Sequence, residues 1–140
     1  MHIFLVRHGD AGDRLTPLGQ SQIARTAEFL KSLVADVSKT ALLTSQLPRA
    51  VETAEIIKNT LGLSEMTPKS WLTCNTEENT ETCLVQFVAD HPELEVVVAV
   101  SHMPEIEQLL GRLGFYGTAH NGSVHEVEFQ TRTVTHLFVP

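Results

Sequence analysis

The stretch Phe4-Leu5-Val6-Arg7-His8-Gly9-Asp10 (FLVRHGD, residues 4–10) decides the fold, because an apolar run ends there in two side chains that are costly to bury. A second apolar run, Val96–Val100, ends in Ser101-His102. This second run has no polar alternation, which is typical of a central strand buried on both faces. In open α/β sheets, ligands bind outside the carboxyl ends of the strands. The sequence therefore predicts that His8 and His102 lie at one site.

Around these strands, short apolar runs alternate with amphipathic stretches of helical period, which is the pattern of a parallel sheet covered by helices. Strands are predicted at residues 3–6, 41–44 and 96–100, and helices at 17–34, 50–61, 81–89 and 106–113, with a loop at 63–79. Two alternating runs, 124–129 and 134–139, predict an antiparallel hairpin. The expected fold is a three-layer α/β/α sandwich in one domain, residues 1–140, with a mostly parallel central sheet and an antiparallel C-terminal edge hairpin.

The composition narrows the class of protein and of partner. The chain has 140 residues, of which 42% are hydrophobic and 19% charged, and its formal charge is −7. That charge argues against nucleic acid or an anionic membrane as the main partner, because both require a basic face. No signal peptide or membrane span is expected, so a cytoplasmic protein fits best. Cys74 and Cys83, the only cysteines, are expected to be reduced thiols.

Two arginines are predicted at the same edge of the sheet as the two histidines. Arg7 directly precedes His8, and Arg49 falls in the first turn of the helix that follows the strand at 41–44. Guanidinium groups offer paired N–H donors to phosphate oxygens, and helix starts add partial positive charge. The set of Arg7, His8, Arg49 and His102 therefore predicts a pocket for a phosphoryl group.

Each of these residues has an ordinary alternative interpretation. A histidine after a strand is more often a surface or core residue than a catalyst, and Arg49 alone would be a charge on a helix surface. The coincidence of four such residues at strand ends favours a functional site. No metal site is expected, since no histidines have the helical spacing of a zinc pair and no cysteine cluster lies nearby. The remaining histidines are interpreted mostly as solvent-facing or structural: His2, His91, His120, His125 and His136.

Four blocks of sequence together resemble the histidine phosphatase, or phosphoglycerate-mutase-like, superfamily, over nearly all of the chain. They are Arg7-His8-Gly9, Leu15-Thr16 with Gly19, Ser45 with Arg49-Ala50 and Thr53-Ala54, and Ser101-His102-Met103-Pro104. The small size, Asp10 and the last block are most similar to the SixA-type phosphohistidine phosphatases. The chain departs from the common pattern at Gln46, where many members have proline, which leaves the helix start less rigid but removes no reacting group.

The resemblance implies that His8 is the nucleophile and that Arg7, Arg49 and His102 bind the phosphoryl oxygens without a metal or cofactor. Neutral imidazole is a competent nucleophile near neutral pH, and its second nitrogen is expected to donate to a backbone carbonyl. Arg14 matches an arginine that precedes the Leu-Thr block in SixA-like proteins and is a candidate for substrate binding, although an exposed loop charge explains it equally well.

The implied substrate is phosphohistidine on a protein, such as a histidine phosphotransfer domain of a signalling relay. Two alternatives stay open: a phosphatase for a small phosphorylated metabolite, and a non-catalytic module that binds a phosphorylated ligand. A general acid for ester substrates is not obvious. Glu77 and Glu78 are the only carboxylates in the loop where relatives carry one, and a solvated acidic loop is their simpler interpretation.

Overall fold

Two parallel strands, β1 (His2–Arg7) and β4 (Val96–Ser101), pair at the centre of a six-stranded sheet. The computed structural model describes all 140 residues. The sheet has the order β3-β2-β4-β1-β5-β6 and is completed by β2 (Thr40–Thr44), β3 (Thr67–Pro68), β5 (Val124–Glu128) and β6 (Thr133–Phe138). Strands β1, β2, β3 and β4 are parallel to one another, whereas β5 runs antiparallel to β1 and to the edge strand β6. The mostly parallel sheet and its antiparallel edge hairpin match the prediction.

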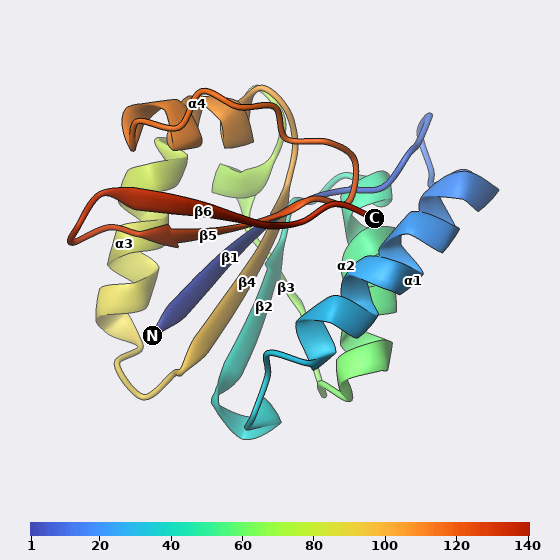
Figure 1. Ribbon diagram of the computed structural model, residues 1–140, viewed down its shortest axis with the longest axis horizontal. Coiled ribbons are helices and arrows are strands. Elements are labelled where there is room, and N and C mark those ends of the chain that lie inside the picture. The colour runs from blue at the N-terminus through green and yellow to red at the C-terminus, as the bar shows by residue number, and fades with distance from the viewer.

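Helices cover both faces of the sheet. Figure 1 shows α1 (Pro17–Lys31) and α2 (Pro48–Leu61) on one side, and α3 (Thr80–Asp90) and α4 (Glu105–Arg112) on the other. Side chains along β4 alternate between two hydrophobic cores. Val98 and Val100 pack in the core under α1 and α2, and Ala99 packs in the core under α3 and α4. All six residues of β4 are buried, because successive side chains point to opposite faces of the sheet and helices cover both faces. The three-layer α/β/α prediction is confirmed.

The structure differs from the prediction mainly in short elements. Residues 63–79, predicted as a loop, contain the two-residue strand β3 and the 3₁₀ helix Ser70–Leu72, which are too short to produce a periodic pattern. A second 3₁₀ helix covers Val37–Lys39. Helix α1 ends at Lys31 rather than at Val34, because the Ser32 hydroxyl donates to the carbonyl of Phe29 (2.6 Å) and closes the last turn. None of the helices has the length and apolar character that a membrane span requires.

The loop after β1 lies directly against the start of α1. Thr16 caps α1 by accepting the Gly19 N–H (3.0 Å), and its hydroxyl donates to the Asp10 carboxylate (2.6 Å). A Cβ atom at Gly19 would lie 2.0 Å from the carbonyl oxygen of Asp10. Only a glycine therefore allows this backbone approach, which holds the residues that follow His8.

We expect Gly19→Ala to destabilise the protein by about 1–3 kcal/mol or more, because the new methyl group meets backbone that cannot move aside. Urea denaturation measures the change in the free energy of unfolding. Gly12→Ala is the matched control, since a Cβ atom there has no heavy atom within 4 Å, and we expect a change within about 1 kcal/mol. Equal stability of the Gly19 variant and the wild type would contradict this description of the loop.

Candidate active site

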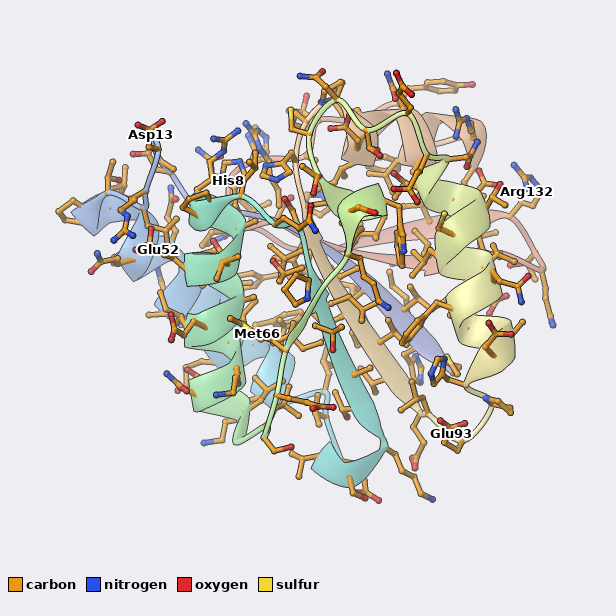
Figure 2. The ribbon with its side chains drawn as sticks, turned by 180° about the vertical axis from the view of Figure 1, so that it is seen from behind. His8, Asp13, Glu52, Met66, Glu93 and Arg132 are labelled. Carbon is orange, nitrogen blue, oxygen red and sulfur yellow. The ribbon has the colours of Figure 1, made fainter.

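The carboxyl ends of β1, β4 and β2 lie side by side, and the polar residues that follow these strands meet there. In the register of β1 and β4, Arg7 is opposite Ser101, so His8 and His102 come next on neighbouring strands. The His8 N–H donates to the carbonyl of Ser101 (3.3 Å), and the centroids of the two imidazole rings are 5.1 Å apart. Figure 2 shows His8 at this end of the sheet, opposite the end that carries Glu93.

The ring of His8 is held in one tautomer. Its Nδ1 atom is 2.7 Å from the carbonyl oxygen of Gly9. A carbonyl can only accept a hydrogen bond, so Nδ1 carries the proton and the neutral ring keeps its lone pair on Nε2. The Nε2 atom has no hydrogen-bond partner in the protein. The ring therefore presents a free nucleophilic nitrogen.

The surroundings of His8 keep this nitrogen unprotonated. Burial lowers the pKa of His8 below its ordinary value of 6.5, and the positive charges of Arg49 and Arg7 lower it further. The hydrogen bond to Gly9 and the Asp10 carboxylate oppose this shift. A lower pKa means that the ring is neutral, and able to attack, over a wider pH range on the acid side.

Only one nitrogen of the Arg7 guanidinium makes a hydrogen bond within the protein. Its Nη1 donates to the carbonyl of Ala119 (2.8 Å), in the loop between α4 and β5, while its buried Nε has no partner. Burial lowers the pKa of Arg7, and the Glu107 carboxylate opposes that effect. An arginine keeps its charge under such shifts, so Arg7 retains unused donors for an anion at the end of β1.

Arg49 is tied to the His8 loop through Thr53, one turn further along α2. The Thr53 hydroxyl accepts the Gly9 N–H (3.3 Å) and donates to the carbonyl of Arg49 (2.9 Å). The half-buried side chain of Arg49 makes no hydrogen bond or salt bridge, yet its charge acts on both His8 and His102. Thr53 thus positions α2 relative to His8 and leaves the guanidinium of Arg49 available to a ligand.

His102 is the most buried of the four residues, with 1% of its surface exposed. Its Nε2 is 2.5 Å from the hydroxyl of Ser45, and its Nδ1 has no partner. Burial, followed by the charges of His8, Arg49 and Arg7, lowers the pKa of His102 to about 3. The ring is therefore neutral at physiological pH, so it offers a hydrogen bond, and the two arginines supply the positive charge of the site.

The structure brings Arg7, His8, Arg49 and His102 together, and the charges of Arg7 and Arg49, but not that of Arg14, act on the two histidines. Arg14 lies exposed in the loop before α1, and its side chain makes no hydrogen bond or salt bridge. Figure 2 shows its neighbour Asp13 at the outer tip of that loop. Glu77 and Glu78 are exposed on the loop before α3, where the Glu78 carboxylate accepts from the hydroxyl of Ser70 (2.5 Å).

Two contacts of the site were not predicted from the sequence, namely the Ser45 bond to His102 and the Thr53 bond to Gly9. Both residues stand in the block around Arg49, which was their only signal. Cys74 and Cys83 are free thiols. No three His, Cys, Asp or Glu side chains are grouped as metal ligands would be. A cavity of about 440 Å³ lined by Leu43, Leu63 and Phe87, among others, includes none of the four residues.

A family model decides the relationship of this chain to known proteins. The model of the histidine phosphatase superfamily (branch 1) matches residues 3–73, which include Arg7, His8 and Arg49. The chain belongs to the histidine phosphatase superfamily. No curated protein sequence matches it.

Solved structures with the same fold include several phosphatases. The protein histidine phosphatase SixA, solved with tungstate, has a TM-score of 0.80 and 22% identity, covering 99% of this chain and 95% of that one. A protein of Agrobacterium tumefaciens assigned as SixA has a TM-score of 0.75 and 16% identity, covering 99% and 97%. A phosphoserine phosphatase of Entamoeba histolytica has a TM-score of 0.73 and 17% identity, covering 99% and 95%. At these identities, the likeness concerns the fold.

We expect the ring resonances of His102 not to titrate between about pH 8 and pH 5 in this histidine phosphatase, because its pKa is lowered to about 3. NMR of ring-labelled histidine measures this directly. The unfolded chain binds the proton near the ordinary pKa of 6.5. The stability due to the neutral ring is thus complete above that pH and is lost as the pH falls towards 3. A midpoint near 6.5 for His102 would contradict the buried, neutral ring.

Proposed function

We propose that this histidine phosphatase hydrolyses phosphohistidine through a phosphorylated His8, without a metal ion or cofactor. Its proposed substrate is a phosphorylated protein in the cytoplasm, such as a histidine phosphotransfer domain. One observation carries the proposal: the Nδ1 of His8 is bonded to the Gly9 carbonyl (2.7 Å), which leaves Nε2 free beside two arginines. That arrangement suits nucleophilic attack on phosphorus better than simple ligand binding.

In the first step, the lone pair of His8 Nε2 attacks phosphorus, and the bond from phosphorus to the leaving nitrogen of the substrate breaks. Arg7 and Arg49 stabilise the charge on the equatorial oxygens, and His102 contributes a hydrogen bond. His8 keeps its proton on Nδ1, so the phosphorylated ring is cationic. The Gly9 carbonyl, which already accepts that N–H, stabilises this cation.

In the second step, water attacks the phosphorus of phosphorylated His8. The bond to Nε2 breaks and its electron pair returns to the ring, while a proton of the water passes to a phosphate oxygen. Dihydrogen phosphate leaves, and His8 returns to the neutral tautomer with its proton on Nδ1. Both steps are displacements at phosphorus that require positioning and positive charge, which the four residues can supply.

The position of the carboxylates favours phosphohistidine over an alkyl phosphate. An alkoxide leaving group needs a proton in the transition state, whereas a protonated imidazole leaves as a neutral amine. Glu77 and Glu78 are exposed, and the Glu78 carboxylate is bonded to Ser70 (2.5 Å). Neither lies in the buried, apolar environment in which a carboxyl group works as a general acid. The fold shared with SixA is consistent with this substrate.

The second candidate function is hydrolysis of a small phosphorylated metabolite. It is favoured by proteins of the same fold that include a phosphoserine phosphatase and a mycobacterial glucosyl-3-phosphoglycerate phosphatase, the latter with a TM-score of 0.70 and 18% identity, covering 91% of this chain and 89% of that one. The four phosphate-binding residues would serve either substrate, so the leaving group distinguishes the two.

The experiment measures kcat/KM of the wild type and of His8→Ala on a phosphohistidine peptide, on phosphoramidate and on phosphoserine. We expect the wild type to prefer phosphohistidine over phosphoserine by at least about 100-fold, the size of effect that a missing general acid produces. His8→Ala is expected to lose turnover of every substrate while its circular dichroism spectrum stays native.

Two arginine variants serve as matched controls in this assay. Arg49→Ala is expected to lower kcat/KM about 100- to 1,000-fold, as for loss of one preorganised donor. Arg25→Ala removes an equal charge from the exposed surface of α1 and is expected to keep wild-type activity. Phosphoserine turnover equal to that of phosphohistidine would favour the metabolite phosphatase. Near-wild-type activity of His8→Ala would refute the mechanism.

A further inference from the structure

A small cavity lies between α4 and the loop that follows it. It has a volume of about 250 Å³ and is lined by Glu107 and by residues 115–118 of the loop. The same loop supplies the Ala119 carbonyl that holds Arg7 (2.8 Å). The cavity is therefore joined to Arg7 through the backbone of this loop.

The carboxylate of Glu107 is an unexpected charge at this place. Glu107 is exposed in the first turn of α4 and makes no salt bridge or side-chain hydrogen bond, although its charge acts on Arg7. Arg112, the basic residue of α4, borders a different cavity. A free carboxylate repels a phosphate dianion but attracts a cation attached to it. Its position suits a substrate whose leaving group is positively charged.

Tyr116 adds an aromatic ring to the same cavity. It is 88% exposed, the highest exposure among the large hydrophobic side chains of the chain. Its Cε1 lies 3.8 Å from the position that a Cβ atom on Gly111 would occupy. Gly111 is four residues after Glu107 and so lies on the same face of α4. An aromatic ring and a carboxylate on one face are the two groups that attract an organic cation.

We propose that this cavity binds the protonated imidazole of phosphohistidine, with Glu107 accepting the N–H of the ring nitrogen that does not carry phosphorus and Tyr116 packing against the ring. The inference rests on the proposed function and assigns it a specificity-determining site. Glu107 acts on the leaving group, whereas Arg7, Arg49 and His102 act on the phosphoryl oxygens.

The chemistry of the leaving group explains why a carboxylate in this cavity would favour hydrolysis of phosphohistidine. When His8 attacks, the bond from phosphorus to nitrogen breaks and the electron pair returns to that nitrogen. The imidazole leaves neutral, with its proton still on the other nitrogen, so no proton is transferred in this step. A carboxylate next to the ring raises its pKa and increases the protonated, reactive fraction near neutral pH. Such a carboxylate does not favour hydrolysis of an ester, because the leaving oxygen of an ester becomes negative.

The experiment compares Glu107→Gln with the wild type on a phosphohistidine peptide, phosphoramidate and p-nitrophenyl phosphate. We expect kcat/KM for the peptide to fall at least about tenfold, because the neutral glutamine amide can still accept the ring N–H but no longer gives the stronger, charge-assisted bond to the protonated ring. The value for p-nitrophenyl phosphate is expected to rise, because a negative charge is removed from beside the phosphate. The ammonia that leaves phosphoramidate is too small to occupy the cavity, so its response should follow p-nitrophenyl phosphate.

The pH profile provides a readout that a purely structural role would not change. Without the carboxylate, the pKa of the bound imidazole falls, so the alkaline limb of the phosphohistidine profile shifts to lower pH. Tyr116→Ala should raise KM for the peptide, and Tyr116→Phe should preserve it, because packing does not need the hydroxyl. Glu93→Gln is the matched control: it removes an equal charge from the opposite end of the sheet (Figure 2). We expect its kcat/KM to equal that of the wild type for all three substrates.

Three results would overturn the inference. If Glu107→Gln lowered kcat/KM equally for all three substrates, the residue would support the pocket generally and not the leaving group. If it changed none of them, the cavity would have no part in turnover. If the wild type hydrolysed p-nitrophenyl phosphate but not the phosphohistidine peptide, the proposed function itself would fail, and this site with it.

Discussion

The parallel pairing of β1 with β4, in the register that sets Arg7 opposite Ser101, is the constraint on which the site depends. The two strands end level, so the residues that follow them, His8 and His102, come within ring contact (5.1 Å) although nearly a hundred residues separate them. A shift of one residue would exchange the two faces of either strand and would break both hydrophobic cores. The burial that stabilises the fold therefore also fixes the geometry of the two histidines.

The arginines and the histidines of the site have different charge states. The arginines keep their charge, while burial and those same charges hold the two histidines neutral: the pKa of His8 is lowered, and that of His102 falls to about 3. In the proposed mechanism a neutral His8 is the form that attacks, and the neighbouring guanidiniums keep it neutral without a separate base. The positive charge that we propose attracts the phosphoryl group thus also lowers the pKa of the proposed nucleophile.

The loop that holds Arg7 packs against the edge hairpin of β5 and β6. Its Phe115 packs edge-on against His125 of β5 (5.1 Å between centroids), which stacks on His136 of β6 (4.3 Å). His125 is fully buried, and burial together with His136 and His120 lowers its pKa to about 4, so the ring behaves as an uncharged packing group. The edge hairpin therefore reaches the site indirectly, through the backbone of this loop.

The sequence predicted those parts of the molecule that depend on local pattern. Apolar runs that end in Arg7-His8 and in Ser101-His102 predicted the layers of the fold and the meeting of the two histidines. The proton-bearing nitrogen of His8 was expected to face a carbonyl, and it bonds Gly9 (2.7 Å). The neutrality of His102 was not predicted, because it depends on tertiary burial. The position of Glu107 beside Arg7 was not predicted either, since it depends on how α4 and its loop fold back.

Identification of the phosphorylated nitrogen tests the central claim most directly. The enzyme is quenched in alkali during turnover of the phosphohistidine peptide, and ³¹P NMR of its isolated active-site peptide distinguishes the two isomers of phosphohistidine. Because Nδ1 of His8 is bonded to the Gly9 carbonyl, the phosphate is predicted on Nε2 of His8. Phosphate on Nδ1, or on any other residue, would contradict the account.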